Sequence, residues 1–240
     1  MTGSAPEEIL PVDLDRPTSI FLVGTDRALL KWVAVALLAR YADRVYWTDI
    51  RRADETLEPL DPLAMHAVPE DHIHVVTPRE MERDEEQIRR VDAASAQVNR
   101  SDEPPESLRR ITEFLRLPAR TQARIVSTST GEKPAILVAS NAHLLMGIYP
   151  REAIAPMIHA ILDSGVSLVL LWTATPPPLR SVFDVVLVVD GDIAHWKDAT
   201  LRSEQGVTTG PLGTGPPVPL AELPAIAHLL ERSLGGPGSR

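Results

Sequence analysis

The sequence contains no cysteine among its 240 residues, which excludes disulfides, thiolate nucleophiles and cysteine-based zinc or iron–sulfur sites. Aromatic residues make up only 4% of the chain, too few to predict a platform for stacking nucleic acid bases. The net charge of −9 argues against a broad phosphate-binding surface. No apolar run reaches the roughly 18 residues of a transmembrane helix. We therefore expect neither a nucleic acid partner nor a membrane partner.

The first 16 residues contain four acidic side chains and no basic region followed by an apolar stretch. This pattern differs from a secretory signal. Together with the missing cysteines, it predicts a cytoplasmic protein.

Six short, almost continuously apolar runs are typical of strands that are buried on both faces of a parallel sheet. They span residues 18–23, 44–48, 72–76, 135–139, 167–172 and 185–189. Helix-forming segments at 28–41 and 151–163 lie between them, and residues 190–192 are expected to turn the chain into a strand within 194–202. The pattern predicts an α/β fold with a mostly parallel central sheet, helices on both faces and a C-terminal β-hairpin.

Composition divides the chain into four parts. Residues 1–17 are expected to be a flexible lead-in, and residues 18–205 the α/β domain, with a charged helical insertion at about 78–124. Residues 206–219 are rich in Gly, Thr and Pro and predict a linker. Residues 220–240 predict an amphipathic helix and a tail. The helix has one apolar stripe, which either folds back onto the domain or contacts a neighbouring protein; it consists of Leu220, Leu223, Ile226, Ala227, Leu230 and Leu234.

In parallel α/β sheets, ligands bind beyond the carboxyl ends of the strands. The first strand is followed by Gly24 and Thr25. A phosphate-binding loop requires a second glycine five residues after the first, then lysine and Ser or Thr. Those three positions hold Leu29, Leu30 and Lys31, so the lysine comes one position late, about 100° around a helix. Gly24, Thr25 and Lys31 remain candidate contacts for a nucleotide.

A dinucleotide-binding unit is the alternative for the same segment. The distance from Gly24 to Asp49 is suitable, and Asp49 follows the second strand, where an acidic residue binds a ribose. The second and third glycine positions, however, hold Asp26 and Leu29.

The strand at 135–139 ends where a magnesium-dependent nucleotidase needs an aspartate, because magnesium prefers hard oxygen ligands. Ala139 stands at that position and provides no ligand. Ser140 and Asn141 follow, and they are either hydrogen-bonding contacts for a ligand or helix-capping residues.

The order of these elements resembles that of RecA-type ATPases of the KaiC branch, over about residues 18–206. The segments that carry the likeness are SIFLVGTDRALLKW, KPAILVASNAHLL and FDVVLVVDGDIAHWKDATLRSEQG. The resemblance implies a RecA-like three-layer fold and ATP binding, often between the subunits of a ring. The family's phosphate-loop and magnesium positions fall on Leu29, Leu30 and Ala139, and only Asp49 keeps an acid.

Two hypotheses follow. The first is a non-catalytic RecA/KaiC-like interaction or regulatory module that associates with itself or with a paralogous ATPase. The second is a protein that binds ATP or a dinucleotide through an unconventional phosphate loop. We predict no catalytic residue and no metal ligand, and ATP is the only cofactor left open. The candidate binding residues are Gly24, Thr25, Asp26, Lys31, Asp49, Ser140 and Asn141.

Overall fold

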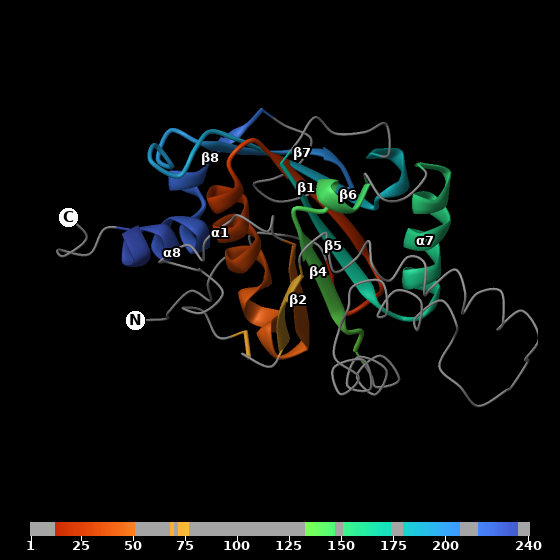
Figure 1. The fold of residues 1–240 in the computed structure, drawn as a ribbon. Coiled ribbons are helices and arrows are strands. Elements are labelled where there is room, and N and C mark those ends of the chain that lie inside the picture. The colour runs from red at the N-terminus through yellow and green to blue at the C-terminus, as the bar shows by residue number, and fades with distance from the viewer. Residues whose placement is uncertain are drawn as a thin grey trace, which may run out of the picture.

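A computed structural model describes residues 13–50, 68–69, 72–76, 133–146, 151–173, 180–206 and 216–234. Within these residues, eight strands form one sheet in the order β3-β2-β4-β5-β1-β6-β7-β8 (Figure 1). The strands from β3 to β6 in this order are parallel, whereas β7 and β8 join the edge in antiparallel pairs. The prediction of an α/β fold with a mostly parallel sheet is confirmed.

The six predicted strands are all present, with ends shifted by a residue or two. They are β1 Ser19–Gly24, β2 Val45–Ile50, β3 Ile73–Val76, β4 Ile136–Ser140, β5 Ser167–Trp172 and β6 Val185–Asp190. Continuous burial along β1 and β4 explains why an apolar run without alternation predicts them correctly.

Three α-helices of more than two turns accompany the described strands. They are α1 Arg27–Leu38, α7 Arg151–Asp163 and α8 Pro224–Leu234. A one-turn helix α6, His143–Met146, follows β4. α1 ends three residues earlier than predicted, because the chain tightens into the 3-10 helix η1, Ala39–Arg44. Short 3-10 helices η3, Arg180–Val182, and η4, Leu220–Glu222, precede β6 and α8.

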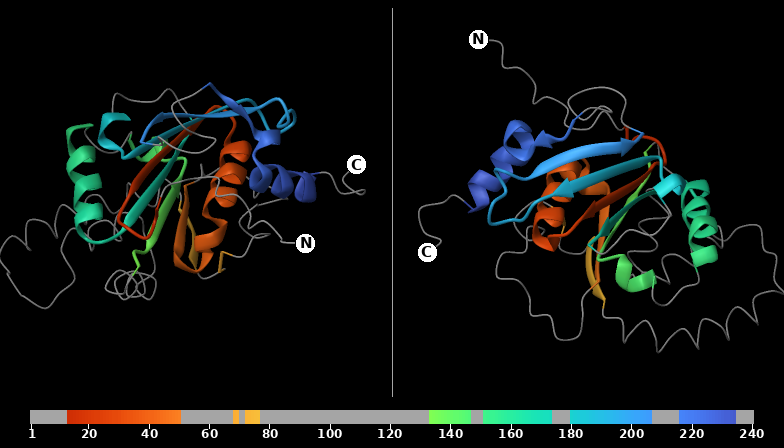
Figure 2. Two further views of the ribbon diagram at one scale, coloured as in Figure 1. Left: turned by 180° about the vertical axis from the view of Figure 1, so that it is seen from behind. Right: turned by 90° about the horizontal axis from the view of Figure 1, so that it is seen from above.

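The sheet has a hydrophobic core on each face, and helices lie against both faces (Figures 1 and 2). Side chains alternate along β1, so that Ile20 and Leu22 pack toward α1 and α8, and Phe21 and Val23 belong to the opposite core. α7 covers that opposite face through Ile158 and neighbouring side chains. Helices on both faces are thus present, as predicted.

The chain after β6 differs from its prediction. β7, Thr200–Gln205, pairs with β6 in antiparallel fashion, but the strand expected from residue 194 begins only at 200. The intervening residues form turns: Asp192 accepts a hydrogen bond from the backbone N–H of His195 at 2.9 Å. Trp196 is buried in the core on the α1 side, so the alternation within residues 194–199 does not arise from a strand, whereas residues 200–202 belong to β7.

The C-terminal region folds back onto the domain. β8, Val218–Pro219, lies within the predicted linker and pairs with β7; residues 207–215 lie outside the described residues. The apolar stripe predicted for the last helix packs against α1, and its four fully buried members are Leu220, Leu223, Ile226 and Leu230. The stripe is therefore part of the protein's own core.

Residues 13–17 were expected to belong to a flexible lead-in. Leu14 is instead buried in the core on the α1 side, and Asp15 forms an ion pair with Arg44. Residues 1–12 and the predicted insertion at 78–124 lie outside the described residues.

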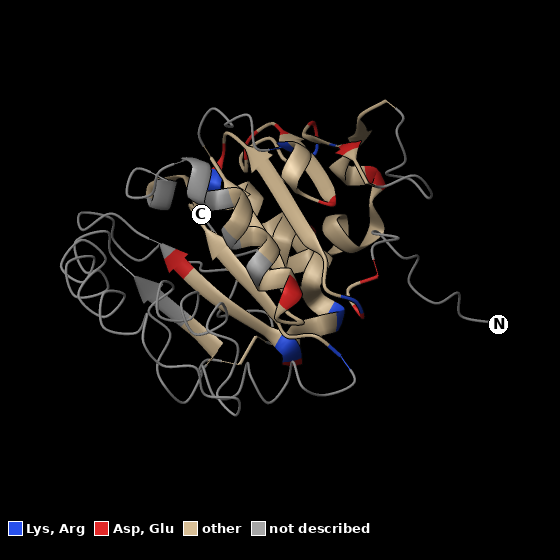
Figure 3. Ribbon diagram, turned by 90° about the vertical axis from the view of Figure 1, so that its right-hand side faces the viewer, with Lys and Arg blue, Asp and Glu red and all other residues tan. Residues whose placement is uncertain are grey.

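Charged side chains in the described part of the chain lie mainly at the ends of strands and helices and in loops (Figure 3). Among the helices described, none combines the length and the apolar composition needed to cross a bilayer.

Candidate functional site

The carboxyl ends of β1, β2 and β4 meet the first turn of α1, and the sequence places its candidate residues there. β1 ends at Gly24, where an added Cβ atom would lie only 2.9 Å from the carbonyl oxygen of Val189 and 3.1 Å from the side chain of Leu30. Gly24 therefore allows β1, β6 and α1 to approach closely. Thr25 follows in an exposed position.

Asp26 caps α1 with its own carboxylate. Its Oδ1 accepts a hydrogen bond from the backbone N–H of Leu29 at 2.8 Å, and its Oδ2 accepts one from the backbone N–H of Ile193 at 3.1 Å. A helix N-terminus has unsatisfied N–H groups and a partial positive charge, and in a phosphate loop these attract the phosphate. Here Asp26 supplies the negative charge, so a phosphate in the same place would be repelled.

The two leucines at the phosphate-loop positions face the core. Leu29 is 0% exposed and Leu30 is 1% exposed, and both pack between the sheet and α1. Burial of each side chain stabilises the fold by roughly 1.5–3 kcal/mol. These positions thus contribute packing and offer no side-chain donor to a phosphate.

Lys31 and Asp49 form a buried ion pair. Lys31 Nζ lies 3.0 Å from Asp49 Oδ2, with the two side chains 2% and 0% exposed. Burial removes both charges from water, and such a pair is tolerated when each charge has good partners. Asp49 has further partners, because Arg27 Nη2 lies 3.8 Å from its Oδ1.

Ser140 completes this cluster from the neighbouring strand. Asp49 on β2 and Ser140 on β4 are register partners, and the Ser140 hydroxyl donates a hydrogen bond to Asp49 Oδ1. We call Arg27, Lys31, Asp49 and Ser140 the Asp49 cluster. Its carboxylate is fully enclosed, so it cannot accept a proton from a bound molecule without a rearrangement of its partners.

Asn141 shapes the turn after β4. Its φ of 54° lies in the left-handed region, which asparagine adopts more readily than most residues. Its carbonyl oxygen accepts a hydrogen bond from the backbone N–H of Leu144 at 2.9 Å, which starts α6.

Three predicted site residues, Lys31, Asp49 and Ser140, are thus brought together. The other four have the separate local roles described above: Gly24, Thr25, Asp26 and Asn141. Sequence reasoning missed Arg27. It lies four residues before Lys31 on α1, and this spacing places both cations on one helix face.

In the described part of the chain, no group of three or more His, Asp or Glu side chains could hold a metal ion. The sequence matches no protein-family model and no curated protein sequence.

Proposed function

We propose that this protein is a non-catalytic RecA/KaiC-like module that acts through protein contacts and does not turn over ATP. The observation that carries the proposal is the buried ion pair between Lys31 Nζ and Asp49 Oδ2 at 3.0 Å. Lys31 is the lysine nearest to the phosphate-loop position, and Asp49 is the only acid kept at a family position. Because each neutralises the other, neither is available to a nucleotide.

The residues present do not fit ATP with magnesium. Asp26 already occupies the N-terminus of α1, where a phosphate would bind. Ala139, at the magnesium position, has no oxygen ligand to offer from its side chain, and the next residue, Ser140, donates to Asp49. A phosphate and its metal would therefore meet a carboxylate, two buried leucines and a closed ion pair.

Dinucleotide binding, the alternative, has less support. A ribose would need hydrogen bonds from Asp49, whose side chain is 0% exposed. The strand order also differs from that of the dinucleotide-binding fold, in which the first strand lies beside the second. In this chain β1 lies between β5 and β6.

The proposal of a protein partner, which is either a second copy of the chain or a paralogous ATPase, rests on the resemblance to proteins that assemble side by side. The apolar stripe of α8 does not provide the contact, because its main members are buried against α1. A partner must therefore bind another surface.

Calorimetric titration with ATP and magnesium, combined with a phosphate-release assay, tests the loss of nucleotide chemistry. We expect neither saturable heat nor release above buffer. Saturable ATP binding that Arg27→Gln weakens would contradict the proposal, and Arg232→Gln, which changes an exposed arginine on α8, is the matched control. Steady hydrolysis that is abolished by Asp49→Ala, with the variant shown to be folded by circular dichroism, would also contradict it.

Light scattering of the full chain tests association. We expect a mass above that of one chain at micromolar concentration, or a co-purifying protein. A monomer without a partner would refute the interaction part of the proposal. Truncation after residue 206 is unsuitable for this purpose, because it removes four buried core residues.

A further inference from the structure

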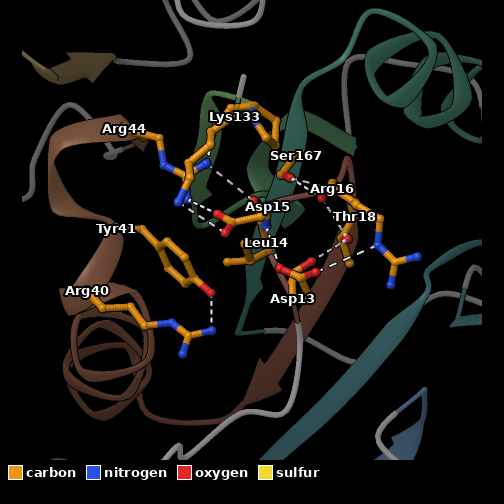
Figure 4. A network of polar contacts seen from close by, with 11 residues as sticks. Asp13, Leu14, Asp15, Arg16, Thr18, Arg40, Tyr41, Arg44, Lys133 and Ser167 are labelled. Carbon is orange, nitrogen blue, oxygen red and sulfur yellow. Dashed lines mark hydrogen bonds and ion pairs between the residues drawn. The ribbon is translucent and has the colours of Figure 1, made fainter. Parts of the chain in front are cut away.

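A pocket of about 580 Å³ lies at the amino-terminal ends of the strands. The Asp49 cluster lies at the other, carboxyl-terminal ends of the strands. The pocket lies among residues that precede β1, β2 and β4 (Figure 4). Ligand pockets are commonly between about 300 and 1,000 Å³, so this one has room for a small molecule. We call it the basal pocket. Three carboxylates and three cations line it: Asp13, Asp15, Asp43, Arg40, Arg44 and Lys133.

Arg44 makes the basal pocket a fixed structure. The residue is 8% exposed, and its guanidinium donates to the carbonyl oxygens of Leu14 and Pro134 at 3.5 and 3.1 Å and to Asp15 Oδ1 at 2.8 Å. These bonds join three chain segments that are distant in sequence. A buried, multiply bonded guanidinium holds the pocket walls in place before any ligand arrives.

Hydrogen-bond donors in the lining of the basal pocket suit a carboxylate. The Arg40 guanidinium lies 4.5 Å from the centre of the Tyr41 ring and donates to the Tyr41 hydroxyl. Because this hydroxyl accepts from Arg40, its own proton can be donated to a ligand oxygen. The ammonium group of Lys133 has three donors, and one of its contacts is Asp15 Oδ2 at 3.2 Å.

The carboxylates differ in what they already bind. Asp15 contacts both Arg44 and Lys133, so its charge is compensated within the protein. Asp13 Oδ1 accepts from the backbone N–H of Asp15 at 2.9 Å, and Asp13 Oδ2 is 3.8 Å from the exposed Arg16. Asp43 is exposed on the pocket wall. Asp13 and Asp43 thus offer negative charge to a ligand.

From this arrangement we infer that the basal pocket binds a zwitterionic α-amino acid or dipeptide. The described lining residues carry three cations and three carboxylates, so among them the charges of both signs balance. A simple anion would be attracted by the cations and repelled by the carboxylates. A ligand with one carboxylate and one ammonium group complements both sets. Its carboxylate binds Arg40, Lys133 and the Tyr41 hydroxyl, and its ammonium group binds Asp13 and Asp43. This inference does not depend on the proposed function.

Thermal unfolding of the full chain with each standard L-amino acid, and with the dipeptide of each with glycine, identifies the tightest ligand. Calorimetry then compares that ligand with its N-acetyl and C-terminal amide derivatives, each of which lacks one charge. We expect each derivative to bind at least about tenfold more weakly, because each loses the charge-assisted hydrogen bonds made by one end of the ligand.

Variants assign the binding to the basal pocket. Arg40→Gln and Asp43→Asn each change one exposed lining side chain, a cation and a carboxylate respectively, and each is expected to weaken binding about tenfold. Lys197→Gln and Asp198→Asn, exposed and remote from the pocket lining, are the matched controls and should bind like the wild type.

The inference is overturned if no amino acid or dipeptide binds at millimolar concentration. It is equally overturned if the N-acetyl derivative binds as well as its parent, which would indicate an anion site, or if the pocket variants bind normally.

Discussion

Lys31 on α1 and Asp49 at the end of β2 lie 3.0 Å apart between Nζ and Oδ2, and both are shielded from water. The first turn of α1 brings Arg27 to the same carboxylate, and β4 brings Ser140. Three elements therefore meet at one buried charge. The first turn of α1 and the carboxyl ends of β2 and β4 are thus held together by the protein's own side chains.

Lys31→Met should destabilise the protein by about 3–5 kcal/mol, because it leaves the Asp49 carboxylate buried without its cation. The double variant Lys31→Met/Asp49→Leu should recover much of that loss, since no uncompensated charge remains. Urea unfolding of the wild type, both single variants and the double variant gives the coupling between the two sites. Additive effects of the two single changes would show that the ion pair does not couple them.

Asp26→Ala should cost about 0.5–2 kcal/mol for the lost helix cap, and further stability for the lost bond to the backbone of Ile193. Asp26→Asn is the matched variant, because asparagine caps helices about as well while carrying no charge. The asparagine amide has one acceptor oxygen, so we expect Asp26→Asn to keep the bond from the Leu29 N–H, to lose the bond from the Ile193 N–H, and to fall between Asp26→Ala and the wild type in thermal unfolding. Equal losses in both variants would mean that the bond to the Leu29 N–H, which only the asparagine can keep, contributes little to stability.

Leu230→Ala should cost about 2–5 kcal/mol, because Leu230 is fully buried between α8 and α1 and the truncation leaves a cavity. His228→Ala, on the exposed side of the same helix, should change stability by no more than about 0.5 kcal/mol. Denaturant unfolding of the two variants and the wild type measures both changes in stability. A Leu230→Ala protein as stable as the wild type would show that α8 is not docked in solution.

Strands could be predicted where an apolar run is buried on both faces, a property of the run itself, as in β1, β4, β5 and β6. The C-terminal stripe was equally visible, but its spacing alone could not say whether it packs on α1 or on a partner. The Asp49 cluster could not be predicted, because it depends on β2 lying beside β4 with Asp49 opposite Ser140. Sequence spacing could only place Arg27 and Lys31 on one helix face.

The strand expected from residue 194 was wrong for a related reason. Alternation in residues 194–202 satisfies the strand pattern, but Asp192 bonds to the N–H of His195 and Trp196 enters the core. The local hydrogen bond and the burial of the Trp196 ring therefore stabilise turns in this segment, and the alternation does not produce a strand there. Asp15 and Arg44 likewise come together only after folding, since 29 positions separate them.

Asp15 should make the protein sensitive to acid. The hydrogen bond from Lys133, the largest cause, and the contact with Arg44 hold the pKa of the Asp15 carboxyl below its ordinary value, against an opposing effect of burial. Because this pKa is lower in the folded protein than in the unfolded chain, the carboxylate contributes stability above its unfolded pKa. That contribution is lost as the pH falls through the folded pKa.

The Asp15→Asn variant lacks this pH-dependent contribution, so the stability of the variant should fall less steeply than that of the wild type below about pH 4. Urea unfolding of both proteins across the acidic range measures the difference, with Asp198→Asn as the control at an exposed position outside the basal pocket. Parallel curves for the wild type and Asp15→Asn would show that the contacts with Lys133 and Arg44 do not form in solution.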